Sequence, residues 1–154
     1  MSRLVGILML AMCVATSAHA QAAKKIRFAA GYAFAKYLEE GGGSAPLGLY
    51  FSGQGLEDIS FKAELSYHRD SEDFFYSTIT LNTFVGLIGP VINYPAGNGH
   101  GFIHMLVGGR EDRIEDEGNF SMGGELGMGF DLPASPSVFI RPGADFQIFT
   151  NDSD

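Results

Sequence analysis

The sequence predicts an all-β fold, namely an antiparallel up-and-down transmembrane β-barrel of the eight-stranded type with about seven strands present. The first reason is a strict two-residue alternation, clearest in residues 119–130 and 138–149, where apolar side chains alternate with small or charged ones. Successive side chains of a strand point to opposite faces of the sheet, so each run has one apolar and one polar face. The second reason is that acidic connections alternate with compact neutral turns along the chain. Both features are typical of a barrel with lipid outside and a narrow polar interior.

Residues 1–20 are predicted to be a secretory signal peptide that is removed after Ala20. Arg3 supplies a positive start, residues 4–14 form an apolar core, and the AHA sequence at 18–20 is a small-x-small cleavage site. The apolar core is shorter than the roughly 20 residues that a membrane-spanning helix needs. A lipoprotein leader is the alternative, because the residues before Cys13 are similar to a lipobox, although a bulky methionine directly precedes the cysteine.

The remaining residues, 21–154, are predicted to form one outer-membrane β-barrel domain. The only cysteine of the chain lies in the leader, so no disulfide can stabilise this domain. The whole chain has a formal net charge of −8 and no basic cluster, which argues against nucleic acid as a partner. No part of the domain has a long unbroken apolar run, so helical membrane spans are not expected.

The first three predicted strands already show the two kinds of face. Residues 26–36 place aromatic side chains on one face and small residues on the other, which suits a tight lumen. Residues 47–52 form a shorter strand. Residues 59–68 alternate apolar and polar residues, and Lys62 and Glu64 lie on the face opposite the apolar one. A solvated sheet face would give the same pattern in this strand.

The later strands repeat the pattern with one irregularity. The fourth strand begins at Phe74 and can run to Tyr94, with a lost ladder bond or a bulge at Pro90, which has no amide proton. Residues 101–110 form the fifth strand, and the hairpin of residues 119–130 and 138–149 completes the set. The charged residues on the polar faces of this hairpin are Glu125, Arg141 and Asp145.

The connections indicate which end of the barrel lies outside the cell. Acidic loops at 37–46, 69–73 and 111–118 follow the first, third and fifth strands, and neutral turns follow the others. Outer-membrane barrels have longer loops outside and short turns on the periplasmic side, so the acidic loops are candidate sites for an extracellular ligand. An even number of strands is needed to pair the first with the last. Because only residues 150–154 follow the seventh strand, the domain is expected to be C-terminally incomplete.

Four segments are similar in order and spacing to a known family. They are GYAF at Gly31–Phe34, TFVGLIGP at Thr83–Pro90, HMLVGGR at His104–Arg110 and IRPGADFQI at Ile140–Ile148. With these segments the chain resembles the small bacterial outer-membrane β-barrel family related to the OmpA/OmpX-type eight-stranded domains. The resemblance implies an eight-stranded barrel in the outer membrane of a Gram-negative cell. The chain departs from the family pattern at its end, where the closing strand with its terminal aromatic residue is absent.

The polar faces supply the candidate site, a charge network that fills the lumen. Unpaired charges are costly in a low-dielectric interior, so side chains of opposite sign at matching heights are expected to pair. An eight-stranded barrel is normally just wide enough to be filled by side chains, which favours a structural network over a narrow, porin-like pore lined by the same residues. The predicted lumen charge network consists of Lys62, Glu64, Glu125, Arg141 and Asp145, with Arg27 near the rim.

Neither a catalytic site nor a cofactor is expected. Ser66, His68 and Asp70 share one face of a strand, but the His-x-Ser-Asn arrangement of barrels that modify lipid A is missing. His100 and His104 lie four residues apart with no carboxylate at an obvious spacing, so no metal site is expected either.

The expected function is that of a monomeric, non-enzymatic outer-membrane barrel with an envelope-structural or surface-interaction role, surrounded by outer-membrane lipid. One alternative is a secreted soluble β-barrel that binds a small apolar ligand, in which the apolar faces point inward and the charged faces outward. A lipid-modifying outer-membrane hydrolase and a narrow pore are further alternatives.

Overall fold

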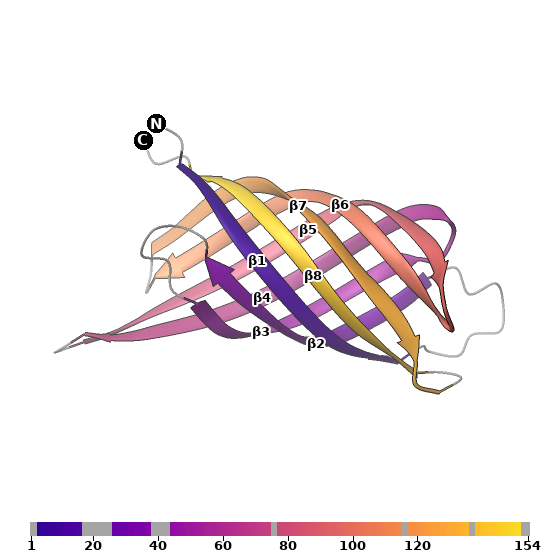
Figure 1. Ribbon diagram of the computed structural model, residues 1–154. Coiled ribbons are helices and arrows are strands. Elements are labelled where there is room, and N and C mark those ends of the chain that lie inside the picture. Colours follow the sequence, from indigo (N-terminus) through magenta and orange to yellow (C-terminus); the bar gives the residue numbers. More distant parts are fainter. Residues whose placement is uncertain are drawn as a thin grey trace.

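The computed structural model describes residues 3–16, 26–37, 44–74, 77–114, 117–135 and 138–151. These residues form an all-β, antiparallel up-and-down fold in which every strand pairs with its neighbour in the chain (Figure 1). The strands are β1 (Arg3–Thr16), β2 (Ile26–Tyr37), β3 (Ser44–Gly55), β4 (Ile59–Phe74), β5 (Ser77–Ala96), β6 (Gly99–Ile114), β7 (Glu117–Pro133) and β8 (Val138–Asn151). Strands β2 to β8 make a strongly curled sheet, and β1 pairs with both of its edges, which closes the sheet into a barrel. The described ranges contain no helix long and apolar enough to span a membrane.

The seven strands expected from the alternation correspond to β2–β8, but two of the expected loops are largely strand. The segment 69–73 belongs to β4, and most of 111–118 belongs to β6 and β7. The antiparallel ladder continues there through pairs such as Asp73 with Thr78 and Ile114 with Glu117. Charged residues do not by themselves end a strand, because the hydrogen bonds of the ladder are formed by backbone N–H and C=O groups.

The wall sorts side chains by parity along each strand. On β4 the side chains of Ile59 and Phe61 are about 70% exposed, whereas Lys62 and Glu64, which have the opposite parity, are almost fully buried. The other strands whose side chains the structure describes repeat this arrangement, with apolar residues outside and mainly polar or small residues inside. The structure therefore has a polar interior and an apolar exterior.

The interior is packed with side chains. Its apolar part is a cluster formed by Ala29, Ala33, Ala35, Tyr50, Val85, Leu87, Leu106, Phe139 and Phe149. The three alanines lie on the inner face of β2, as the small residues there had predicted, and they leave room for larger side chains from the opposite wall. The largest fully buried side chains include Arg141, Lys62 and Phe149, which fill the barrel along its length.

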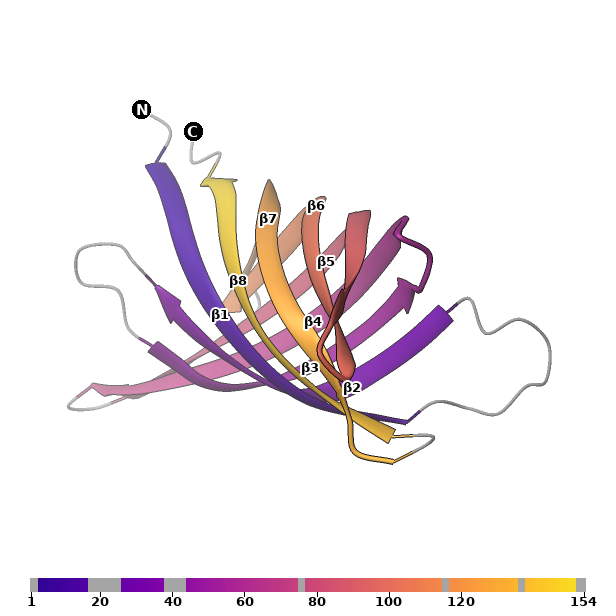
Figure 2. The ribbon, with the colours of Figure 1, turned by 45° about the vertical axis from the view of Figure 1, so that its right-hand side comes forward.

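Strand β1 is formed by residues that the sequence predicts to be a signal peptide. Its backbone pairs with β8 from Arg3 beside Asn151 to Thr16 beside Val138, and with β2 on its other side (Figure 2). In this structure β1 therefore takes the place of the closing strand that was expected to be missing after β8. Because β2 and β8 are both antiparallel to β1, they run parallel to each other. They could not close the barrel directly with an antiparallel ladder.

Residues 3–16 cannot be both a cleaved signal peptide and strand β1 in the same molecule. Because Cys13 lies in this segment, its presence or absence distinguishes the two cases. We expect protein recovered from membranes to begin at Gln21, because the leader carries a small-x-small cleavage site after Ala20. The denatured protein should then lack the mass of the leader and should not react with a maleimide, since Cys13 is the only cysteine. A full-length mass with one maleimide adduct would contradict cleavage and would leave β1 as the closing strand.

Candidate functional site

The candidate site is a buried network of charged and polar side chains in the centre of the lumen. Strand β4 contributes Lys62 and Glu64, β6 contributes His104, β7 contributes Glu125, and β8 contributes Asp145. Side chains alternate between the two faces of a strand, and these five residues occupy positions that point inward. All five are at most 3% exposed.

A glycine allows the β6 and β8 members of this network to meet. Gly127 on β7 pairs with His104 on one side and with Asp145 on the other. A Cβ atom at Gly127 would collide with both the Asp145 carboxylate and the His104 ring. Since glycine has no side chain, His104 Nε2 and Asp145 Oδ1 approach to 3.2 Å across it.

The distances within the centre describe a continuous set of ion pairs. Lys62 Nζ lies 2.7 Å from Glu64 Oε2 and 3.2 Å from Nε2 of His104. His104 Nε2 lies 2.7 Å from Glu125 Oε1. With Asp145, the centre brings together three carboxylates, one ammonium group and one imidazole, so these groups offset much of one another's charge in a place that water reaches poorly.

Two neutral side chains donate further hydrogen bonds to the carboxylates. The Tyr50 hydroxyl donates to Glu64 Oε2 over 3.1 Å, and Gln147 Nε2 donates to Glu125 Oε2 over 2.6 Å. Hydrogen bonds to its carboxylates help a buried ion pair to offset the cost of desolvation, so Tyr50 and Gln147 belong to the network. Glu64 Oε1 has no hydrogen-bond partner among the described residues.

Arg141 lies in a second cluster, nearer the end of the barrel that carries the β7–β8 turn. Its guanidinium forms a bidentate pair with Asp131, at 2.7 and 2.9 Å, and donates to Ser52 Oγ over 3.2 Å. Arg27 also binds Asp131, at 2.7 Å, and stacks over the Phe139 ring with its guanidinium carbon 4.9 Å from the centroid. This cluster fills the lumen at the turn end with two arginines, a shared carboxylate and an aromatic ring.

A third group lies toward the opposite end of the barrel. Arg110 Nε is 2.8 Å from Asp112 Oδ2, and the Thr83 hydroxyl donates to Asp112 Oδ1 over 2.6 Å. Charged groups are therefore paired at three levels along the lumen, and at this third level the pair lies on β6 and is joined to β5 by Thr83.

The structure brings together four of the five residues predicted for the network and separates the fifth. Lys62, Glu64, Glu125 and Asp145 meet in the centre, whereas Arg141 pairs with Asp131 instead. Asp131 is not among the residues predicted for the network, although it continues the inward parity of Glu125 on the same strand. The sequence pattern favours a rim or wall histidine at position 104 over a metal ligand and does not place His104 in the network, because the carboxylates beside it come from β4, β7 and β8 and are distant in the sequence.

A metal site has partial support in the geometry of the centre. Ligand atoms of Glu64, His104 and Glu125 lie within 4.8 Å of one another, as in a site for a divalent metal ion. However, Lys62 Nζ already lies 2.7 Å from Glu64 and supplies a positive charge there. The arrangement therefore fits an ion-pair network better than a metal site.

The Ser66, His68 and Asp70 set lacks the contacts that a hydrolase needs. Ser66 and His68 are buried on the inner face of β4. Within the described part of the chain, neither the Ser66 hydroxyl nor the two ring nitrogens of His68 have a hydrogen-bond partner. A serine nucleophile is activated by a hydrogen bond to its base, and this structure does not form that bond.

Comparison of the chain with protein-family models, curated proteins and solved structures gave no match. The resemblance to the OmpA/OmpX-type domains therefore stays a prediction.

Removing the central cation should destabilise the barrel strongly. Lys62→Met leaves Glu64 buried without its partner, and breaking a buried pair costs about 3–5 kcal/mol of folding free energy. The double variant Lys62→Met/Glu64→Gln should recover part of this loss, because no uncompensated carboxylate remains at that position. Urea unfolding in detergent micelles, followed by circular dichroism, measures both effects.

The matched control is the exposed pair of Arg113 with Glu111, whose side chains are 56% and 39% exposed. Arg113→Met should change the unfolding free energy by less than about 1 kcal/mol. If Lys62→Met were as mild as this control, or if the losses from Lys62→Met and Glu64→Gln were simply additive, the two residues would not form a coupled buried pair.

Proposed function

We propose that this chain is a non-enzymatic, integral β-barrel protein of a bacterial outer membrane, with a filled lumen and an envelope-structural or surface-interaction role. The observation that carries the proposal is the distribution of side chains across the wall. Apolar residues are exposed around the outside, and charged residues are buried and paired inside. Soluble monomeric proteins rarely expose continuous apolar patches larger than a few hundred Å², whereas a barrel in a bilayer requires such a surface.

The height of the apolar band supports the proposal. On β5 the outward positions of the segment from Phe84 to Tyr94 form an apolar face that extends over ten residue steps of the strand. With a rise of about 3.3 Å per residue and a tilt of about 40°, this stretch covers about 25 Å along the barrel axis. That value equals the usual height of the lipid-facing band of outer-membrane barrels. Aromatic residues lie at both of its edges, with Tyr67 and Phe84 at one and Tyr94 at the other, as in interfacial aromatic girdles.

The packed lumen favours a structural role over conduction. Side chains fill the barrel at three levels, and Lys62, His104 and Arg141 are each held by ion pairs that would have to break for an ion to pass. The soluble alternative requires apolar faces turned inward and charged faces turned outward, which is the reverse of the arrangement described above.

Cell fractionation tests the proposal directly. The expressed full chain should remain with the membrane pellet after a carbonate wash, because an apolar band about 25 Å high holds it in the bilayer. Recovery in the soluble periplasmic fraction would overturn the proposal and would favour a secreted soluble barrel.

A pair of substitutions on one strand tests which part of the wall faces lipid. Leu126 is 59% exposed and lies in the middle of the apolar stretch of β7, whereas Leu132 is 48% exposed near its turn end. Leu126→Arg should cost about 2–4 kcal/mol of folding free energy in a bilayer, and Leu132→Arg only about 0–1 kcal/mol. Equilibrium unfolding in phospholipid vesicles measures both, and equal costs would contradict a membrane midplane at Leu126.

A further inference from the structure

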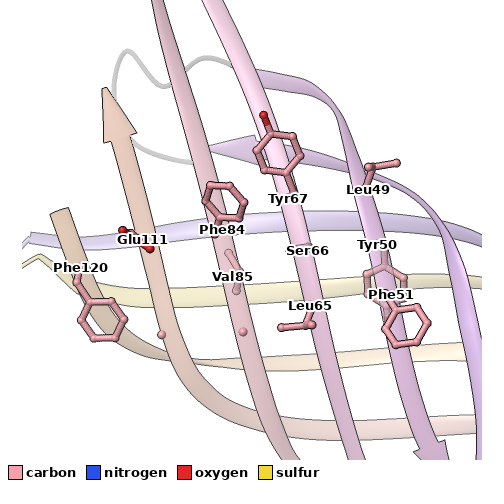
Figure 3. A pocket seen from close by; sticks show the side chains of 12 residues that line it. Leu49, Tyr50, Phe51, Leu65, Ser66, Tyr67, Phe84, Val85, Glu111 and Phe120 are labelled. Carbon is pink, nitrogen blue, oxygen red and sulfur yellow. The ribbon is translucent and has the colours of Figure 1, made fainter. Parts of the chain in front are cut away.

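The outer wall carries a hollow on one side, over strands β3 to β7 (Figure 3). It has a volume of about 550 Å³, and its walls are the outward side chains of Leu49, Phe51, Leu65, Phe84 and Phe120. A second hollow of about 470 Å³ shares Phe51, Leu65 and Gly86 with the first, so the two form one continuous apolar groove on the outer surface.

Two neighbouring glycines form the floor of this groove. Gly86 of β5 pairs with Gly109 of β6, and Leu65 of β4 pairs with Gly86 on its other side. Because these glycines have no side chain, the surface is recessed there. The recess has Leu65 and Phe84 on one side and Phe120 on the other. The Phe120 ring lies over Gly109 so closely that a Cβ atom there would meet it at 2.5 Å. The groove is therefore shaped by the sequence and is not a gap left by loose packing.

A polar row lies at the end of the groove that is nearer the loops between β4 and β5. Arg69, Asn82 and Arg113 are direct partners across β4, β5 and β6. The Tyr67 hydroxyl donates to Asn82 Oδ1 over 2.8 Å, so the carbonyl of Asn82 is engaged and its amide NH₂ is the group left to donate. Strands are about 4.8 Å apart, which places the two arginines about 10 Å apart with an amide donor between them.

These two arginines are the outward cations of the described wall. The other basic residues whose side chains the structure describes, Arg27, Lys62, Arg110 and Arg141, all pair with carboxylates inside the barrel. Arg69 is exposed and has no ion-pair partner among the described residues. Arg113 is 56% exposed, pairs with Glu111 at 2.7 Å and stacks over Phe84 at 6.0 Å. The chain has a net charge of −8. Nevertheless, Arg69 and Arg113, the two outward-facing basic residues whose side chains the structure describes, both lie at the end of the same apolar groove.

We propose that this row and groove bind an anionic, phosphate-bearing membrane lipid. The phosphate would be held by the guanidinium groups of Arg69 and Arg113 and by the amide of Asn82, because arginine forms bidentate hydrogen bonds with phosphate. An acyl chain would lie over Gly86, beside the Phe120 ring that covers Gly109. The proposal rests on the proposed function, since a lipid reaches this face only when the barrel is in a bilayer.

Charge complementarity selects this occupant. The groove accepts a flexible apolar chain, and the arginines stand where the apolar band ends, which is the level of lipid phosphates in a bilayer. Glu111 competes with the phosphate for Arg113 because it already binds that guanidinium. Removing its charge should therefore strengthen lipid binding, an effect that simple deposition of lipid on an apolar wall would not produce.

The test is native mass spectrometry of the folded protein as it is recovered from membranes, released from neutral detergent micelles that contain equal amounts of phosphatidylglycerol and phosphatidylcholine. We expect one phosphatidylglycerol to be retained in preference to phosphatidylcholine. The double variant Arg69→Gln/Arg113→Gln should lower this retention about tenfold, because charge-assisted hydrogen bonds to the phosphate are lost. Glu111→Gln should raise it. Gly86→Leu, whose first side-chain atom has an ordinary 3.4 Å contact with Leu65, should lower it by filling the groove.

The matched control is Met128→Gln, an exposed position on the wall of β7 away from the groove, which should retain the lipid as the unaltered chain does. Equal retention of both lipids, or unchanged retention in the arginine double variant, would overturn the proposal while leaving the barrel in the membrane. Binding of inorganic phosphate alone with no retained lipid would assign the row to a free anion and would overturn the lipid site. A chain that does not enter bilayers at all, seen in the carbonate wash, would overturn this proposal and the proposed function together.

Discussion

The structure depends on the pairing of charges inside a wall that has little room for water. An eight-stranded barrel is just wide enough for side chains, and a charge that stays unpaired in such an interior is costly. The chain satisfies this constraint at three levels. Arg110 pairs with Asp112 toward one end, Lys62 and His104 pair with three carboxylates in the centre, and Arg27 and Arg141 share Asp131 toward the other end. The central cluster joins four strands, β4, β6, β7 and β8, and the cluster around Asp131 joins β2, β3, β7 and β8, so these two levels also fix how the strands are placed around the barrel.

Small residues set the shape of the wall on both of its faces. Inside, Gly127 lets His104 and Asp145 meet across β7, and the alanines of β2 make room for side chains from the opposite wall. Outside, Gly86 and Gly109 lie side by side and lower the apolar surface into a groove. Because side chains alternate between faces, a glycine affects only the face to which its side chain would have pointed. The same residue type therefore serves the charge network inside and the surface groove outside.

The first and last strands raise a separate constraint. An up-and-down sheet closes with antiparallel pairs only when its number of strands is even, and β1 provides the eighth strand in this structure. The residues of β1 also have the pattern of a secretory leader. A chain without them would leave β2 and β8 as parallel edges that need another strand between them. The direction of these edges is a matter of topology and does not depend on which side chains they carry.

The sequence by itself determined the all-β class, the antiparallel strands β2–β8 and the face on which each charged residue lies, because the two-residue period of a strand is a local property. It also indicated Lys62, Glu64, Glu125 and Asp145 as interior residues. It placed the ends of β4 and β6 too early, since backbone pairing continues through charged segments that local composition marks as loops. Only the tertiary structure decided which of these residues form pairs. His104 meets Lys62, Glu125 and Asp145, and Arg141 meets Asp131. Strand register and barrel curvature bring these residues together although most of them are distant in the sequence, and no local pattern encodes the height at which two strands align.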